Sequence, residues 1–83
     1  MKLKLMFREY CSLCRKMRED LQPLQTAYGF ELEIIDVDED EALEAAYNEL
    51  VPVLLHRDEI ICHWYLDEAR TRACLDVLCA EEA

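Results

Sequence analysis

The stretch KLKLMFREYCSLCRKM, residues 2–17, combines an alternating apolar segment, two cysteines three residues apart and several basic residues. Alternation of polar and apolar residues at positions 2–5 is typical of a strand with one buried face. From about Ser12 to Tyr28, apolar residues recur at spacings of three and four, which predicts an amphipathic helix. The apolar positions of this helix are Cys14, Met17, Leu21, Leu24 and Tyr28. The stretch therefore predicts a strand that leads into a helix, with the cysteine pair at the junction.

The remaining chain continues this alternation of strands and helices. Gly29 is placed to end the first helix, and Pro23 predicts a kink or a division within it. Residues 30–37 are predicted to form a second strand. Asp38 and Glu41 together resemble a capping box, which predicts the start of a short second helix. That helix has its apolar face at Leu43, Ala46, Tyr47 and Leu50.

Two short apolar segments, residues 51–56 and 59–64, predict a hairpin of two antiparallel strands. Asp67 then caps a last helix, whose expected apolar stripe is Ala69, Ala73, Cys74, Val77 and Leu78. The order of elements is βαβαββα, and the first two strands must run in parallel. The sequence thus predicts a single α/β domain over residues 1–83, with a four-stranded mixed sheet and helices on both faces.

Composition and charge exclude several classes of function. A hydrophobic fraction of 53% in 83 residues is ample for one core and argues against disorder. The formal net charge of −10 disfavours binding to nucleic acid or to an anionic membrane, because both require clustered cations. The sequence shows no signal peptide and no apolar run of membrane-spanning length. We therefore expect a cytoplasmic protein that acts as a monomer.

Cys11 and Cys14 are the candidate catalytic residues. Cys11 would lie at the start of a helix, where its sulfur faces unpaired N–H groups and the positive end of the helix dipole. Such an environment stabilises the thiolate, which is the nucleophilic form of cysteine. The nearby charges act in the same direction, since residues 8–18 contain the basic Arg8, Arg15, Lys16 and Arg18 and the acidic Glu9 alone. Cys14 lies one helical turn further and can resolve a mixed disulfide at Cys11.

Two other interpretations of this pair stay open. Structural zinc usually requires four ligands, and the other half could come only from His56, Cys62 or His63. Adjacent strand residues point to opposite faces, so Cys62 and His63 are not expected to bind the same metal ion. The pair could also be coincidental packing, but a C-x-x-C that ends a strand and opens a helix favours redox chemistry.

The other chemically notable residues are expected to be structural. Cys74 and Cys79 are interpreted as small buried hydrophobic residues, and Cys62 as a core residue of a strand rather than a peripheral thiol. Trp64 and Tyr65 are expected to be packing residues, with the flank of a substrate groove as the alternative. The stretch DVDEDE, residues 36–41, lacks the glycine and the final glutamate of a calcium loop.

With YCSLC after the first strand and VPV before the third, the chain resembles the thioredoxin fold. More narrowly it resembles the small bacterial glutaredoxin-like domains, from about Lys2 to Leu78. The resemblance implies that Cys11 is the nucleophile and Cys14 the resolving cysteine. It also implies a cis-proline at Pro52 that faces the dithiol, and backbone hydrogen bonds from Val51 to a bound thiol substrate.

The resemblance assigns two further substrate contacts. Arg8 occupies the place where glutaredoxins often carry a lysine that assists the thiolate or contacts glutathione. Asp67 stands at the helix start that binds the γ-glutamyl amine of glutathione. The chain departs from the family pattern at Ser12 and Leu13, where Pro-Tyr is usual. It also has CHWYLDE, residues 62–68, where a Gly-Gly pair is usual, which disfavours a close backbone approach by glutathione.

The expected function is that of a small cytoplasmic dithiol–disulfide oxidoreductase in redox homeostasis. Its substrates would be protein or low-molecular-weight disulfides, with glutathione as a candidate co-substrate and no bound cofactor or metal. The alternative is a thioredoxin-fold adaptor module, or a zinc-binding protein, with a non-catalytic C-x-x-C.

Overall fold

The sheet and helices follow the predicted order in the computed structural model, which describes residues 1–82, with side chains for residues 1–81. The elements are β1 (Lys2–Phe7), α1 (Ser12–Tyr28), β2 (Glu31–Asp36), the 3₁₀ helix η1 (Val37–Glu39), α2 (Glu41–Tyr47), β3 (Val53–His56), β4 (Glu59–His63) and α3 (Glu68–Glu82).

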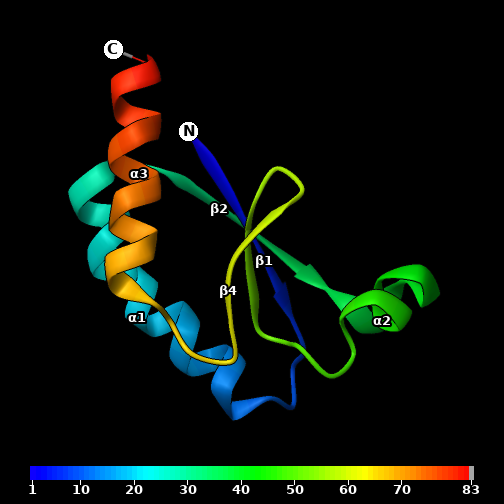
Figure 1. The fold of residues 1–83 in the computed structure, drawn as a ribbon. Coiled ribbons are helices and arrows are strands. Elements are labelled where there is room, and N and C mark those ends of the chain that lie inside the picture. Colours follow the sequence, from blue (N-terminus) through cyan, green and yellow to red (C-terminus); the bar gives the residue numbers. More distant parts are fainter. Residues whose placement is uncertain (83) are drawn as a thin grey trace.

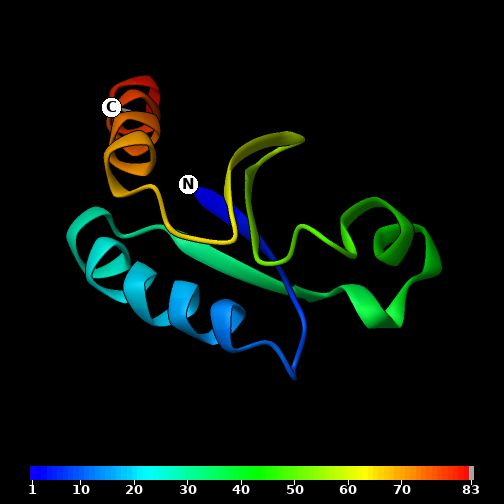
Figure 2. The same ribbon diagram turned by 60° about the horizontal axis from the view of Figure 1, so that its bottom comes forward.

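The four strands form one mixed sheet in the order β2-β1-β3-β4. β1 runs parallel to β2 and antiparallel to β3, and β3 pairs antiparallel with β4. Helices α1 and α3 lie on one side of the sheet and α2 on the other (Figures 1 and 2). The prediction of a four-stranded mixed sheet with helices on both faces is confirmed, and the arrangement is that of the thioredoxin fold.

The main core lies between the sheet and helices α1 and α3. Leu3 and Leu5 on β1 are fully buried, and the register places Leu32 and Ile34 of β2 beside them on the same face. The Leu54–Cys62 pair of β3 and β4 continues this face. Helix α1 contributes the buried side chains of Cys14, Met17, Leu21 and Leu24. The apolar face of the strands and the apolar face of helix α1 therefore pack together, as the alternating and helical patterns of the sequence predict.

Helix α1 ends as expected but is not divided. Gly29 adopts a left-handed conformation with φ of 71°, and its N–H bonds the carbonyl of Gln25 at 2.8 Å. The helix continues through Pro23, which is exposed. A carbonyl that loses its partner on the solvent side of a helix can be hydrated by water. The prediction of a division was therefore wrong, and the alternative of a kink stays a prediction.

The start of the second helix differs from the sequence prediction. Asp40, not Asp38, caps α2, and its carboxylate accepts hydrogen bonds from the N–H groups of Ala42 at 2.8 Å and Leu43 at 3.4 Å. Asp38 lies within η1, whose cap is Asp36. Helix α2 has no fully buried residue, and Ala46 of its predicted apolar face is exposed.

The buried stripe of α3 also differs from the prediction. Thr71, Leu75 and Leu78 are buried, whereas Ala69, Ala73 and Val77 are exposed. The Thr71 hydroxyl donates to the Asp67 carbonyl at 2.7 Å, which satisfies its polarity inside the core. Asp67 does cap this helix, since its carboxylate accepts a hydrogen bond from the N–H of Arg70 at 3.0 Å.

Three connections lie together at one end of the molecule. The β1–α1, α2–β3 and β4–α3 segments occupy the lower end in Figure 1, while the β3–β4 turn and the N-terminus lie at the other. Among the described residues, no helix is long and apolar enough to span a membrane.

Candidate dithiol site

The sulfur of Cys11 caps helix α1. Cys11 has an extended backbone (φ −114°, ψ 109°), and its Sγ accepts a hydrogen bond from the backbone N–H of Cys14 at 3.2 Å. The carbonyl of Cys11 accepts the N–H of Arg15, also at 3.2 Å. The sulfur therefore lies among the unpaired N–H groups at the positive end of the helix. This is the geometry that the sequence predicts for position 11.

The two cysteines of the pair have different surroundings. Cys11 is partly exposed, whereas Cys14 is fully buried, and both are free thiols. Burial is the main cause that raises the pKa of Cys14, to about 12, and its hydrogen bond with the Cys11 side chain adds to this. The backbone of Arg8 acts in the opposite direction. Cys14 is thus held protonated at neutral pH and in contact with the sulfur of Cys11.

The loop before β3 faces the same end of the sheet. Met6 of β1 pairs with Val53 of β3, so Pro52 lies beside the point where β1 leads into the cysteine segment. The Val51–Pro52 peptide bond is cis. The N–H of Val51 donates to the Tyr47 carbonyl at 3.1 Å, so this N–H is engaged within the protein.

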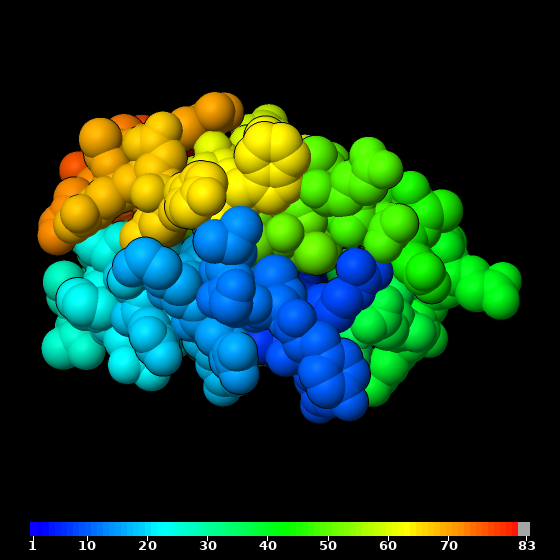
Figure 3. Space-filling view, turned by 90° about the horizontal axis from the view of Figure 1, so that it is seen from below, coloured from blue at the N-terminus to red at the C-terminus, as the bar shows by residue number. Residues whose placement is uncertain are grey.

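Figure 3 looks directly onto this end. The blue surface of the β1–α1 segment borders the yellow surface of the β4–α3 segment above it and the green surface of the α2–β3 segment beside it. The three segments thus meet at this end.

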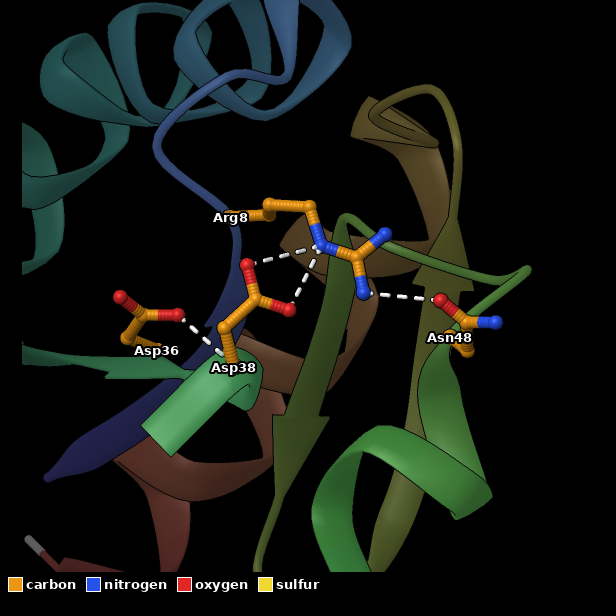
Figure 4. Close-up of polar contacts among 4 residues, drawn as sticks. All are labelled: Arg8, Asp36, Asp38 and Asn48. Carbon is orange, nitrogen blue, oxygen red and sulfur yellow. Dashed lines mark hydrogen bonds and ion pairs between the residues drawn. The ribbon is translucent and has the colours of Figure 1, made fainter. Parts of the chain in front are cut away.

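Arg8 links this end of the sheet to the α2 side of the molecule. Its Nε donates to both carboxylate oxygens of Asp38, at 3.0 and 3.2 Å, and its Nη2 donates to the side-chain oxygen of Asn48 at 2.8 Å (Figure 4). Asp36 orients Asp38 by accepting its backbone N–H at 2.9 Å. Part of the guanidinium is therefore engaged within the protein.

The basic cluster near Cys11 is partly neutralised by carboxylates. Arg8 pairs with Asp38, and Lys16 pairs with Asp20 at 3.2 Å. Sequence counting alone treats Arg8 and Lys16 as cations available to Cys11, and it misses the Arg8–Asp38 pair because the two residues lie thirty positions apart. Asp67, the other charged candidate, has one carboxylate oxygen bound to the start of α3.

A groove of about 240 Å³ runs beside the dithiol, between α1 and the β4–α3 segment. Its lining residues are Leu13, Lys16, Met17, Asp20, Trp64, Tyr65 and Leu66. Trp64 and Tyr65 are 47% and 65% exposed and line this groove, so the structure favours the alternative prediction, that they flank a groove, over the prediction that they are packing residues. Leu13 lies between the two cysteines in the chain, so the groove that it lines is next to the dithiol.

The three other cysteines lie apart from the pair in the sequence and differ in burial. Cys62 is buried, as predicted, and burial raises its pKa. Cys74 is half-buried, with a pKa also raised mainly by burial, and it lines a hollow of about 350 Å³ beside the β3–β4 turn. Cys79 is exposed, so its interpretation as a buried residue was wrong. A second hollow, of about 630 Å³, also lies beside the β3–β4 turn.

No group of three or more His, Cys, Asp or Glu side chains among the described residues is arranged to hold a metal ion.

Comparisons with known proteins identify relatives of both sequence and structure. The profile of the family described as "Glutaredoxin-like domain (DUF836)" matches residues 2–76. The chain is 32% identical over 76 residues to the uncharacterized protein Rv0508 of Mycobacterium tuberculosis, covering 86% of this chain and 78% of that protein.

Two solved structures are similar in both fold and sequence. Protein Ne2328 from Nitrosomonas europaea superposes with a TM-score of 0.78 and 41% identity, covering 88% of each chain. Protein XcR50 from X. campestris gives a TM-score of 0.71 and 37% identity over 90% of this chain and 96% of that one. Fasciola hepatica thioredoxin, at 19% identity and a TM-score of 0.61 over 92% of this chain and 78% of that one, shares the fold.

Proposed function

The chain belongs to the glutaredoxin-like domain family, and from this premise we propose that it is a dithiol–disulfide oxidoreductase that uses Cys11 and Cys14. One observation carries the proposal. A partly exposed sulfur caps the start of α1, and a buried, protonated thiol contacts it from one turn further along the helix.

In the first step, the thiolate of Cys11 attacks one sulfur of a disulfide substrate. A bond forms between this sulfur and Cys11, the substrate disulfide breaks, and the other half leaves as a thiolate that takes a proton from solvent. The helix start that stabilises the anion on Cys11 also gives the attack its direction, because the N–H groups hold the sulfur at the surface of the site.

In the second step, Cys14 attacks the sulfur of Cys11 and releases the second half of the substrate. The hydrogen bond with Cys11 contributes to the raised pKa of Cys14, and the mixed disulfide removes the anion that this bond stabilises. The pKa of Cys14 therefore falls once the first step has occurred. Cys14 loses its proton and forms the Cys11–Cys14 disulfide as the mixed disulfide breaks. The second half leaves as a thiolate that takes up a proton, so the substrate gains the two electrons that the dithiol loses. A thiol reductant must then restore the dithiol.

Four residues are proposed as substrate contacts around the dithiol. Val51 would use its carbonyl oxygen, and Pro52 would lie against the substrate sulfur. Arg8 would use the part of its guanidinium that Asp38 and Asn48 leave free, and Asp67 would use its second carboxylate oxygen. The groove beside Leu13 offers apolar contacts, which suit a protein disulfide or a low-molecular-weight one. Glutathione is a candidate co-substrate, although the net charge of −10 disfavours the binding of this anion.

Redox titration in glutathione buffers, read by mass spectrometry, tests the proposal. We expect a Cys11–Cys14 disulfide to form in oxidising buffer and to disappear in reducing buffer. The Cys14→Ser variant should retain a mixed disulfide on Cys11, and Cys11→Ser should retain none at either position. Cys79→Ser is the matched control and should behave like the wild type. If both dithiol variants behave alike, the assignment of roles fails, and the adaptor alternative gains support.

A further inference from the structure

Trp64 has a backbone conformation that bulky residues rarely adopt. It directly follows β4, and its φ is 66°, in the left-handed region that favours glycine. Its neighbour Tyr65 lines the same groove without this feature. Filling space in the groove does not by itself explain why a tryptophan occupies a backbone position that favours glycine.

Trp64 makes two hydrogen bonds to the loop that precedes β3. Its backbone N–H donates to the carbonyl of Pro52 at 2.9 Å, and its indole Nε1–H donates to the carbonyl of Glu49 at 2.8 Å. The acceptors lie three residues apart, on either side of Val51. The left-handed backbone brings both donors of one residue to the same loop.

The loop makes few hydrogen bonds of its own, and its support comes mainly from the burial of Val51 and Pro52. Leu50 and Val51 donate their N–H groups to the Tyr47 carbonyl, at 2.9 and 3.1 Å. Helix α2, which leads into the loop, has no fully buried residue. Trp64 therefore adds two hydrogen bonds that tie the loop to the end of β4, beside the burial of Val51 and Pro52.

We propose that Trp64 is a positioning residue, which holds the segment Glu49–Pro52 in place beside the dithiol through its indole N–H. The inference rests on the proposed function for its consequence, because Val51 and Pro52 are the proposed substrate contacts. The half-exposed ring of Trp64 also forms a wall of the groove. A substrate that occupies the groove thus contacts the residue that holds the loop.

The variant Trp64→Phe tests this role, because it keeps an aromatic ring in the groove and removes the donor to Glu49. Tyr65→Phe is the matched control, since it changes an adjacent exposed ring that makes no hydrogen bond to the loop. Trp64→Gly removes the ring and the donor while its backbone accepts a φ of 66° without strain. Both positions are exposed, so the three variants are expected to fold.

The first measurement is amide hydrogen exchange of the reduced protein, without substrate. The N–H groups of Leu50 and Val51 should exchange roughly tenfold faster in Trp64→Phe and in Trp64→Gly, which is the size expected for the loss of one hydrogen bond. Tyr65→Phe should leave both rates unchanged. Wild-type rates in both Trp64 variants would overturn the inference.

The second measurement is steady-state reduction of a disulfide peptide. In Trp64→Phe, KM should rise by roughly five- to tenfold with kcat nearly unchanged, because the loop contacts bound substrate while the cysteines are untouched. An unchanged KM together with faster amide exchange would overturn the consequence for substrate binding. Inactivity of the wild type would refute the proposed function instead, and the exchange measurement would still decide whether Trp64 holds the loop.

Discussion

Helices α1 and α3 begin with the same hydrogen bond but with different atoms. In α3, the carboxylate of Asp67 accepts the N–H of Arg70 at 3.0 Å, and in α1 the sulfur of Cys11 accepts the N–H of Cys14 at 3.2 Å. Aspartate is among the preferred capping residues, whereas cysteine is not. The start of α3 is thus built for stability, and the start of α1 places a sulfur where an oxygen would stabilise the helix better.

The charges at the two helix starts differ in the same sense. The first turn of α3 contains Glu68, which interacts favourably with the positive end of the helix. The first turn of α1 contains no acidic residue, so no carboxylate competes with Cys11 for that potential. The comparison indicates that α1 leaves its dipole available to the sulfur of Cys11.

The largest expected effect is that of Cys11→Ser. Serine is a good capping residue, so the free energy of unfolding should stay the same or rise by up to about 1 kcal/mol, while disulfide exchange falls to the background rate. Urea unfolding and reduction of a disulfide peptide measure the two quantities. A variant that keeps its activity would show that the sulfur of Cys11 is not the nucleophile.

The raised pKa of Cys14 predicts a loss of stability at high pH. In the folded protein this thiol titrates at about 12 instead of 9.0, so between these values the unfolded state releases a proton that the folded state keeps. The contribution of Cys14 to the free energy of unfolding is therefore complete below pH 9 and falls as pH rises towards 12.

The difference in unfolding free energy between the wild type and Cys14→Ala isolates this effect from other groups that titrate at high pH, such as Tyr28. Urea unfolding at a series of pH values should show the difference shrinking across this range. A difference that stays constant up to pH 12 would contradict the burial of an ionisable thiol at this position.

The cap of α3 should matter for stability and for substrate binding, and little for the chemical step. Asp67→Ala should lower the free energy of unfolding by about 1 kcal/mol, because the N–H of Arg70 loses its acceptor. Asp67→Asn keeps an oxygen at the cap and should cost less. Turnover of a disulfide peptide at saturating concentration should remain near that of the wild type in both variants. A loss of turnover as large as that of Cys11→Ser would mean that the two helix starts do not divide their roles.

The smallest expected effect is that of Arg8→Met. The ion pair with Asp38 is partly exposed, with side-chain exposures of 25% and 46%, so its loss should cost less than about 1 kcal/mol. Thermal or urea unfolding at low and high salt measures this, and the difference from the wild type should decrease at high salt. A loss of several kcal/mol would show that the Arg8–Asp38–Asn48 contacts hold the fold together.

The regular parts of the fold could be predicted because each carries a clear pattern. Leu3 and Leu5 alternate with lysines, and the helical spacing from Cys14 to Leu24 is unambiguous. The position of Cys11 as a cap follows from these two patterns alone. Its contact with Cys14 follows from the same helical geometry.

Other features depended on contacts between distant residues. The stretch DVDED, residues 36–40, contains three aspartates that could cap a helix. One of them, Asp38, is instead paired with Arg8, which lies thirty positions away. In α3, alanines and cysteines mark more than one face as apolar, so Thr71 was missed although it is buried. No local pattern indicates that the indole of Trp64 reaches Glu49, because that hydrogen bond spans fifteen positions.

The most direct test of the account is the relative alkylation rate of Cys11 and Cys79 in the reduced wild-type protein at neutral pH. Cys79 is the more exposed thiol of the two, and it lies on α3 far from any helix start, so it serves as an internal control. Limited treatment with iodoacetamide followed by peptide mass mapping should show Cys11 modified first, while Cys14 stays unmodified. Modification of Cys79 ahead of Cys11 would contradict the claim that the start of α1 activates the sulfur it holds.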